Sequence, residues 1–355
     1  CVLVVADAYW PGTDTFARLR AALGRDGWQV VHYAGFGGEP TAADIRAATR
    51  LARESGAAQV VGLGGGTALD SAKLIAACAV TGADPGAYAL GRGDMPAAPL
   101  PKILVPTTAG TGSEANGNCI FTGDTGKKLW AFSADNKADR VILDPDLTAS
   151  LPPAVAAWSG MDALVHAFEA ATNRHANRLC QPFALQALGL ICGALERAVT
   201  CPADAQARAD MLLGSFYAGY AIENCGTALA HCVSHALAGC AGVNHALATA
   251  LAFERTLPRV LAAATPEMDA AARACGAGRL ADLGPRIGAM MDRLGIERAL
   301  PGAFARVRAA DLAAEMQAEE NTPMRHACVP GLDASAINDV AADILTLAPE
   351  TEPLP

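Results

Sequence analysis

Residues 59–79, QVVGLGGGTALDSAKLIAACA, combine an apolar β-branched run, three consecutive glycines and a long helical pattern. We predict a buried strand over Gln59–Leu63 and a helix over Ala68–Ala79. Glycines between a strand and a helix let backbone N–H groups close on a pyrophosphate, and the helix dipole favours its charge. An ordinary tight turn has a similar composition, and the G-x-G-x-x-G pattern of dinucleotide-binding proteins is not met. The candidate phosphate-binding residues are Gly64, Gly65, Gly66 and Thr67.

The segments on either side repeat this alternation of short β-rich runs and amphipathic helices. The further predicted strands cover residues 2–6, 28–33, 103–106 and 141–143, and the further predicted helices cover residues 13–26 and 41–55. Such alternation is typical of a parallel, doubly wound sheet. From about Thr148 onward, Ala- and Leu-rich helical patterns follow without a convincing strand. We therefore predict an α/β dinucleotide-binding domain over residues 1–147 and an all-helical metal- and substrate-binding domain over residues 148–355.

A hydroxyl-rich loop, TTAGTGSE at residues 107–114, follows the predicted strand 103–106. Short hydroxyl donors and glycines permit the close approach that a ribose or a nicotinamide amide requires. A plain surface turn is an equally good interpretation of the loop taken alone.

Residues 221–250, AIENCGTALAHCVSHALAGCAGVNHALATA, hold three of the seven histidines of the chain. His231 and His235 are four residues apart, so they share one face of a helix. The glycines at 239 and 242 let the chain turn, so that His245 can return toward the same point.

A second pair, Asp162 and His166, has the same spacing in SGMDALVHAFEA. A lone histidine on an apolar helix face is more often a hydrogen-bonded core residue than a ligand. Burying several ionisable groups is costly, however, unless they are paired or bind a metal, and neither stretch offers Arg or Lys close by. Imidazole nitrogens with one carboxylate oxygen suit Fe(II), Zn(II) or a similar divalent ion. We therefore predict that the two stretches form one metal site.

Composition restricts the class of protein and its partners. The 355 residues are 52% hydrophobic, and their net charge of −9 includes no Lys/Arg cluster, which argues against nucleic acid or an anionic membrane as a partner. The eleven cysteines form no C-x-x-C pair, which fits a reducing cytoplasm. No run of about 18 uninterrupted apolar residues and no signal-peptide pattern occurs. Because the chain opens on CVLVVAD, already a strand and without Met, we expect that native N-terminal residues precede it.

Five segments together closely resemble the iron-containing, group III alcohol dehydrogenases. They are GGGTALDSAK (64–73), PTTAGTGSEAN (106–116), DPDLTASLP (144–152), GMDALVHAFEA (160–170) and HCVSHALAGCAGVNHALATA (231–250). The resemblance covers nearly the whole chain, in the same order. It implies metal ligation by Asp162, His166, His231 and His245. It also implies that His235 is a catalytic or proton-relaying group near the nicotinamide, although a role in orienting a neighbouring group is the alternative.

The resemblance further implies which residues line the cofactor. They are Gly64, Gly65, Gly66, Thr67, Asp70, Thr107, Thr108, Thr111, Asn116, Asn118 and Lys128. The implied protein is a cytoplasmic homodimer that uses Fe(II), or Zn(II), and NAD or NADP to interconvert a small alcohol and its aldehyde. A glycerol-dehydrogenase-like or maleylacetate-reductase-like oxidoreductase, an NAD-recycling synthase and a catalytically silent nucleotide-binding protein are the alternatives. The four-ligand set favours the alcohol dehydrogenase branch.

Three features depart from the family. The small β-hairpin before the first strand is absent, Ala138 replaces a proline, and Ala34 follows the second predicted strand where NAD-preferring members often carry Asp. An acidic side chain at that place in a doubly wound domain binds the ribose 2′-OH and repels the 2′-phosphate of NADP. Glu39 is near enough in sequence to substitute, and no Lys or Arg lies between Ala34 and Thr41. We therefore predict tolerance of both NAD(H) and NADP(H).

Overall fold

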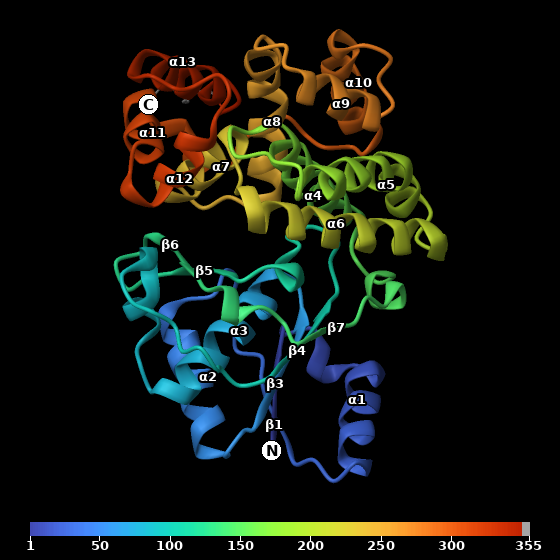
Figure 1. Cartoon of the computed structure of the whole chain (residues 1–355), viewed down its shortest axis with the longest axis vertical. Coiled ribbons are helices and arrows are strands. Elements are labelled where there is room, and N and C mark those ends of the chain that lie inside the picture. Colours follow the sequence, from blue (N-terminus) through green and yellow to red (C-terminus); the bar gives the residue numbers. More distant parts are fainter. Residues whose placement is uncertain (350–355) are drawn as a thin grey trace, which may run out of the picture. The chain divides into compact units, whose positions relative to one another are not determined.

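The computed structural model describes residues 1–349, which divide into two compact units after Thr148 (Figure 1). This division lies one residue from the boundary expected from composition. Residues 350–355, the end of the predicted second domain, lie outside the described residues.

A five-stranded parallel sheet forms the centre of the first unit, with strand order β2-β1-β3-β4-β7. The strands are β1 (Val2–Ala6), β2 (Val30–Tyr33), β3 (Gln59–Gly64), β4 (Lys102–Pro106) and β7 (Arg140–Val141). β1 is buried along its whole length, and β3 is buried at every residue but its first. This explains why the sequence of each strand is a continuous apolar run. The predicted doubly wound parallel sheet is confirmed, although β2 begins two residues later than expected and β7 has only two residues.

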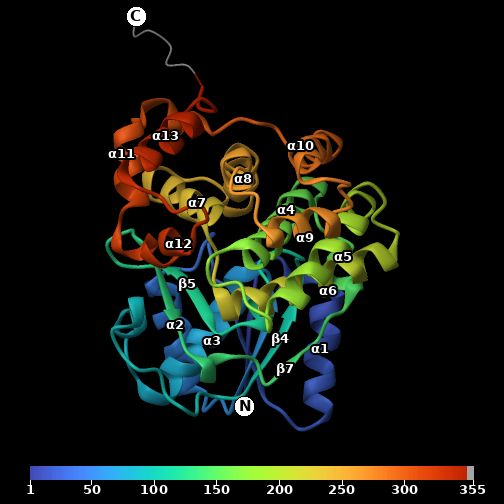
Figure 2. The same ribbon diagram turned by 45° about the horizontal axis from the view of Figure 1, so that its top comes forward.

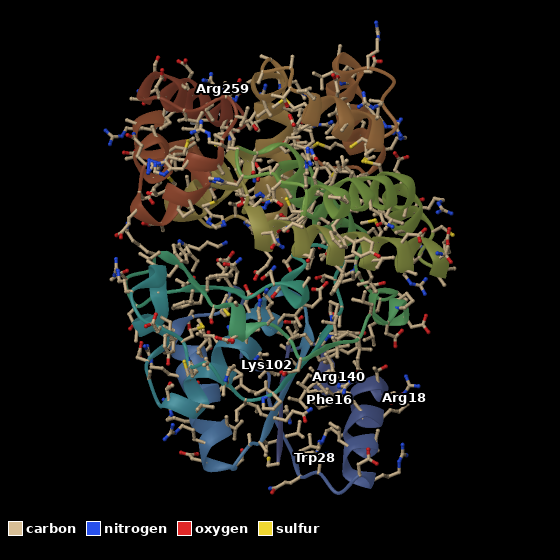
Figure 3. The ribbon with its side chains drawn as sticks, viewed as in Figure 1. Phe16, Arg18, Trp28, Lys102, Arg140 and Arg259 are labelled. Carbon is tan, nitrogen blue, oxygen red and sulfur yellow. The ribbon has the colours of Figure 1, made fainter. Side chains whose placement is uncertain are left out.

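Helices cover both faces of this sheet. They are α1 (Asp14–Arg25), α2 (Ala42–Glu54) and α3 (Gly66–Thr81). Phe16 of α1, only 1% exposed, packs against the face that carries Val4 and Val61 (Figure 3). α2 and α3 pack on the opposite face. Thr13 and Thr41 begin the first two helices because each side-chain oxygen accepts a hydrogen bond from a first-turn N–H.

A separate antiparallel hairpin, which the sequence analysis did not predict, joins β5 (Asn118–Thr122) to β6 (Lys128–Phe132). Cys119, Phe121 and Ala131 are buried against the core that α3 shares with the sheet. The apolar run at residues 119–121 was a usable signal in the sequence. It is short, however, and a charged turn interrupts it.

The second unit contains only helices within residues 149–349. They are α4 (Pro153–Thr172), α5 (Gln181–Thr200), α6 (Ala205–Cys225), α7 (Leu229–Cys240), α8 (His245–Leu261), α9 (Pro266–Ala274), α10 (Leu283–Arg293), α11 (Ala309–Met316), α12 (Thr322–Ala327) and α13 (Ala334–Leu345). α4, α5 and α6 pack on one another, and α8 packs on both α4 and α7 (Figure 2). Gly160 permits the close approach, because a Cβ there would overlap Leu195 and lie 3.0 Å from the Met211 Cε.

Helix α5 is long and apolar enough, by length and composition alone, to cross a membrane. It packs against α4 and α6 within the second unit, and Glu196 near its end pairs with Arg293. The core helix of a soluble unit meets the same criterion, so α5 is weak evidence for a membrane segment.

Candidate metal centre and cofactor-binding loops

The glycine turn lies at the carboxyl end of β3, between the ends of β1 and β4. Gly64 has φ +155, and a Cβ there would overlap the Asp7 carboxylate and lie 2.8 Å from the Ala68 Cβ. A Cβ on Gly66 would lie 2.8 Å from the Thr111 Cγ2. Only glycine fits these positions without displacement of neighbours. The turn feeds directly into α3, whose N-terminus has no side-chain cap, and this arrangement suits an anionic ligand.

The hydroxyl-rich loop that follows β4 lies against this turn. The Thr107 N–H donates to the Gly64 carbonyl at 2.9 Å. The Thr108 Oγ1 lies 3.3 Å from the place where a Cβ on Gly65 would stand. The structure therefore brings Thr107, Thr108 and Thr111 together with the three glycines, and Thr67 begins α3 beside them.

Asp7, which directly follows β1, is an acidic residue at this turn that the sequence analysis missed. Its Oδ2 accepts the Gly65 N–H at 2.8 Å. Burial raises the pKa of Asp7, and the Gly65 hydrogen bond opposes that shift. The available signal was an Asp at the end of the first buried strand.

The segment that follows β2 also reaches the glycine turn. β3 carries the glycine turn, and its neighbours in the sheet are β1 and β4. β2, which precedes Ala34, pairs with β1 alone and is separated from β3 by that strand. The Thr67 hydroxyl nevertheless donates to the Gly38 carbonyl at 3.3 Å, so the residues after Ala34 contact the start of α3. The cofactor preference predicted from Ala34 stays a prediction.

Lys73 is a fully buried cation that the sequence analysis left out of the site. Its Nζ donates to the Ser113 carbonyl at 2.9 Å, to the Asn116 carbonyl at 3.2 Å and to the Asn118 carbonyl. It also lies 3.0 Å from the Asp70 Oδ1. One ammonium group thus holds the loop between the threonines and β5. A lysine within the otherwise apolar residues 71–79 was the signal.

Asp70 accepts hydrogen bonds from the chain itself. Its Oδ2 accepts the Ile120 N–H at 2.9 Å, and its Oδ1 accepts the Ser113 hydroxyl. Asn116 donates to the Gly112 carbonyl at 3.0 Å. Asp70, Asn116 and Asn118 therefore shape the loop in this structure, and their direct contact with a cofactor stays a prediction.

Lys128, on β6, pairs with Glu39 at 2.7 Å. The lysine side chain is 10% exposed and that of Glu39 is 44% exposed. This pair neutralises the carboxylate that was the suggested substitute for an acidic residue at position 34.

Glu114, in the same loop, is only 3% exposed. Its Oε1 has no hydrogen-bond partner within the described chain. Burial raises the pKa of Glu114 to about 7.

The predicted metal ligands converge in the second unit. α4 carries Asp162 and His166, α7 carries His231, and α8 begins at His245. One ligand atom from each of Asp162, His166 and His231 lies within 4.8 Å of the others, and all three residues are buried. The His245 Nε2 lies 3.8 Å from the Asp162 Oδ1. The three predicted histidine ligands thus approach the Asp162 carboxylate, with His245 outside the tight group of Asp162, His166 and His231.

The donor atoms of this cluster fit a divalent cation. The Asp162 Oδ1 and the His231 Nε2 are 3.6 Å apart, and both are buried without a hydrogen-bond partner in residues 1–349. A buried polar atom without a hydrogen-bond partner lowers the stability of the fold. Two such atoms side by side therefore indicate a site where both contact the same ligand. A carboxylate oxygen with imidazole nitrogens is a donor set suited to Fe(II) or Zn(II).

The ionisable groups of the cluster shift one another's pKa values. Burial alone would raise the pKa of Asp162, but His166, His231 and His245 hold that pKa well below its usual range. Burial alone would lower the pKa of His231, but Glu169 and Asp162 raise it to about 9. The cluster therefore stabilises charges of opposite sign close together.

His235 lies beside the ligand cluster and outside it. It is one turn after His231 on α7 and is half-buried. Its ring lies edge-on to that of His245, with the centroids 5.4 Å apart. This position suits a group that acts next to the metal ligands.

Comparisons with known proteins agree with the two units. Residues 1–145 match the model of the iron-containing alcohol dehydrogenase family, and residues 156–325 match that of the Fe-containing alcohol dehydrogenase family, C-terminal. Long-chain-alcohol dehydrogenase 1 of Geobacillus thermodenitrificans (strain NG80-2) is 34% identical over 269 residues, which are 75% of this chain and 68% of that protein.

Solved structures extend the similarity to nearly the whole chain. The sulfoacetaldehyde reductase from Bifidobacterium kashiwanohense, in complex with NAD+, and a 1,3-propanediol oxidoreductase each have a TM-score of 0.87 and 26% identity. Each match covers 97% of this chain and 91% of the other. The predicted family is confirmed: the chain belongs to the iron-containing alcohol dehydrogenases, a family of alcohol and aldehyde oxidoreductases.

Proposed function

We propose that this protein is a metal-dependent alcohol dehydrogenase or aldehyde reductase that transfers hydride between a small alcohol or aldehyde and a nicotinamide cofactor. The observation that carries the proposal is the unpartnered pair of buried atoms, the Asp162 Oδ1 and the His231 Nε2, within a cluster of N and O donors. A shared cation would satisfy both atoms at once.

Asp162, His166, His231 and His245 would hold the cation, with Fe(II) as our first choice and Zn(II) as the alternative. The cation would supply Lewis-acid polarisation of the substrate oxygen. His235 would carry the proton to or from that oxygen, because an imidazole exchanges protons near neutral pH.

The first unit supplies the cofactor site. The glycine turn and the N-terminus of α3 would bind the cofactor phosphates, and Thr107, Thr108 and Thr111 would supply hydroxyl and backbone donors. The carboxylate of Asp7 accepts the Gly65 N–H and would hold the turn in this shape. We propose that both NAD(H) and NADP(H) are accepted, because Ala34 lacks the carboxylate that would repel a 2′-phosphate and Glu39 is paired with Lys128.

The names of similar proteins support a substrate class. Their names include enzymes for long-chain alcohols, sulfoacetaldehyde and 1,3-propanediol, so the shared group is a primary alcohol or an aldehyde. We propose a cytoplasmic homodimer as well. The eleven cysteines include no C-x-x-C pair, the sequence feature on which the proposed reducing compartment rests. Light scattering of the purified protein tests the dimer.

The deciding experiment combines metal analysis with turnover. Wild-type protein purified under anaerobic conditions should contain about one divalent ion per chain and should oxidise NADH with aldehydes of graded size. His231→Ala should bind the ion much more weakly, so that the purified variant is depleted of it, and should lose turnover. A wild-type protein without metal would refute the proposal. A protein that binds NAD and metal but shows no net NADH oxidation with any aldehyde or alcohol would point to a cofactor-recycling synthase instead.

A further inference from the structure

Glu169 is a buried carboxylate next to the metal ligands that the proposed chemistry does not use. It lies on α4, seven residues after Asp162 and three after His166, so all three side chains lie on one face of the helix. It is 5% exposed. Both of its oxygens face the start of α7.

Three donors converge on the Glu169 carboxylate. Its Oε2 accepts the Ala228 N–H at 2.7 Å and lies 2.7 Å from the His231 Nδ1. Its Oε1 accepts the Ala230 N–H at 2.6 Å. Ala228 is the residue before α7 and provides no side-chain cap, so a carboxylate from α4 takes over that role. One side chain thus joins the helix of Asp162 and His166 to the helix of His231.

The same contact decides which nitrogen of His231 is available. Both oxygens of Glu169 already accept backbone N–H groups, so this carboxylate acts as an acceptor and favours a His231 ring that carries its proton on Nδ1 and donates it to Glu169. A neutral ring then has its lone pair on Nε2. That atom is the one that lies 3.6 Å from the Asp162 Oδ1 and has no partner in the described chain.

Ser234 makes a similar but weaker contact with the Nδ1 of His245. The Ser234 Oγ lies 3.0 Å from the His245 Nδ1 and 3.2 Å from the His245 carbonyl oxygen. A hydroxyl that donates to the carbonyl can accept from Nδ1–H, which again leaves Nε2 with the lone pair. Ser234 is fully buried, as Glu169 nearly is. The charged acceptor on His231 is the stronger of the two.

We infer that Glu169 is a positioning residue of the metal centre, which holds His231 as the Nδ1–H tautomer with Nε2 directed at the ligand cluster. The inference rests on the proposed metal site. Partners of this kind typically change metal affinity ten- to a hundredfold when they are removed.

The test is Glu169→Gln in the whole protein, with Zn²⁺ affinity measured by competition against a chromophoric chelator. The amide has nearly the same shape but only one acceptor oxygen for three donors. We expect the Kd for Zn²⁺ to rise ten- to a hundredfold. Asp333→Ala is the matched control, because Asp333 caps α13 in the same unit by accepting the Ala336 N–H at 2.8 Å. It removes a helix cap and should leave Zn²⁺ affinity unchanged.

A double-mutant cycle separates positioning from general loosening of the unit. If Glu169 acts through His231, Glu169→Gln should cause no further loss of Zn²⁺ affinity in the His231→Ala background. An equal loss in both backgrounds would overturn the inference, as would wild-type affinity in Glu169→Gln. If wild-type protein binds no metal at all, the proposed function fails instead.

One measurement needs no substitution at Glu169. In ¹⁵N-histidine-labelled, Zn²⁺-loaded wild-type protein, the His231 ring should show a protonated Nδ1 and a metal-bound Nε2. Binding through Nδ1 would overturn the inference even if the Glu169 variant does not fold.

Discussion

Glu114→Gln is the substitution whose effect the structure determines most directly. Glu114 is 3% exposed in the cofactor loop, and its Oε1 has no partner within the described residues. Burial raises its pKa to about 7 from the ordinary 4.5. A carboxyl with a raised folded-state pKa stabilises the fold most when it is protonated in both states, below pH 4.5. That stability is lost as the pH rises toward 7.

The magnitude follows from the two pKa values. Ionising a carboxyl at pH 8 that titrates near 7 when folded and at 4.5 when unfolded costs about 3 kcal/mol of folding free energy. Glutamine has nearly the same shape and carries no charge at any pH. The variant should therefore be close to wild-type stability at pH 4.5 and more stable than wild type by about 3 kcal/mol at pH 8.

Urea unfolding at pH 4.5 and pH 8 measures this difference. Three of the four tryptophans, Trp10, Trp28 and Trp130, lie in the first unit, so fluorescence follows that unit. Glu54→Gln, at an exposed position on α2, is the control and should respond equally at the two pH values. A stability difference between Glu114→Gln and wild type that is the same at both pH values within about 1 kcal/mol would refute the reasoning. It would mean that the folded state does not raise the pKa of Glu114.

Three further substitutions test the site. Lys73→Met should weaken NADH binding and destabilise the first unit by about 3 kcal/mol, because three loop carbonyls lose their hydrogen bonds to a buried cation. Unchanged NADH affinity in calorimetry would contradict this. Ala34→Asp should lower the ratio of kcat/KM for NADPH to that for NADH at least tenfold, because an acidic side chain there would repel the 2′-phosphate; an unchanged ratio means that another group discriminates. His235→Ala should retain metal and NADH binding, lower kcat and alter the alkaline limb of the pH profile; unchanged turnover would limit His235 to packing.

Local sequence was sufficient for the features that depend on period and spacing. The continuous apolar runs of β1 and β3 predicted buried parallel strands, because residues buried on both faces need no alternation. The spacing of four between Asp162 and His166 placed both on one helix face, which the structure shows on α4. These are properties of a few consecutive residues, and the sequence determines them by itself.

Tertiary structure alone decided which of these elements became neighbours. Ala34 and Asp7 each follow a strand, and only the order β2-β1-β3 puts Asp7 beside the glycine turn. Lys73 and Glu114 are charged residues whose full burial is produced by the hairpin and loops that fold over them. Glu169 has helical spacing from Asp162, but its hydrogen bond to His231 joins residues 62 positions apart. Contacts at such separations depend on how helices and strands pack, and local periodicity carries no information about that packing.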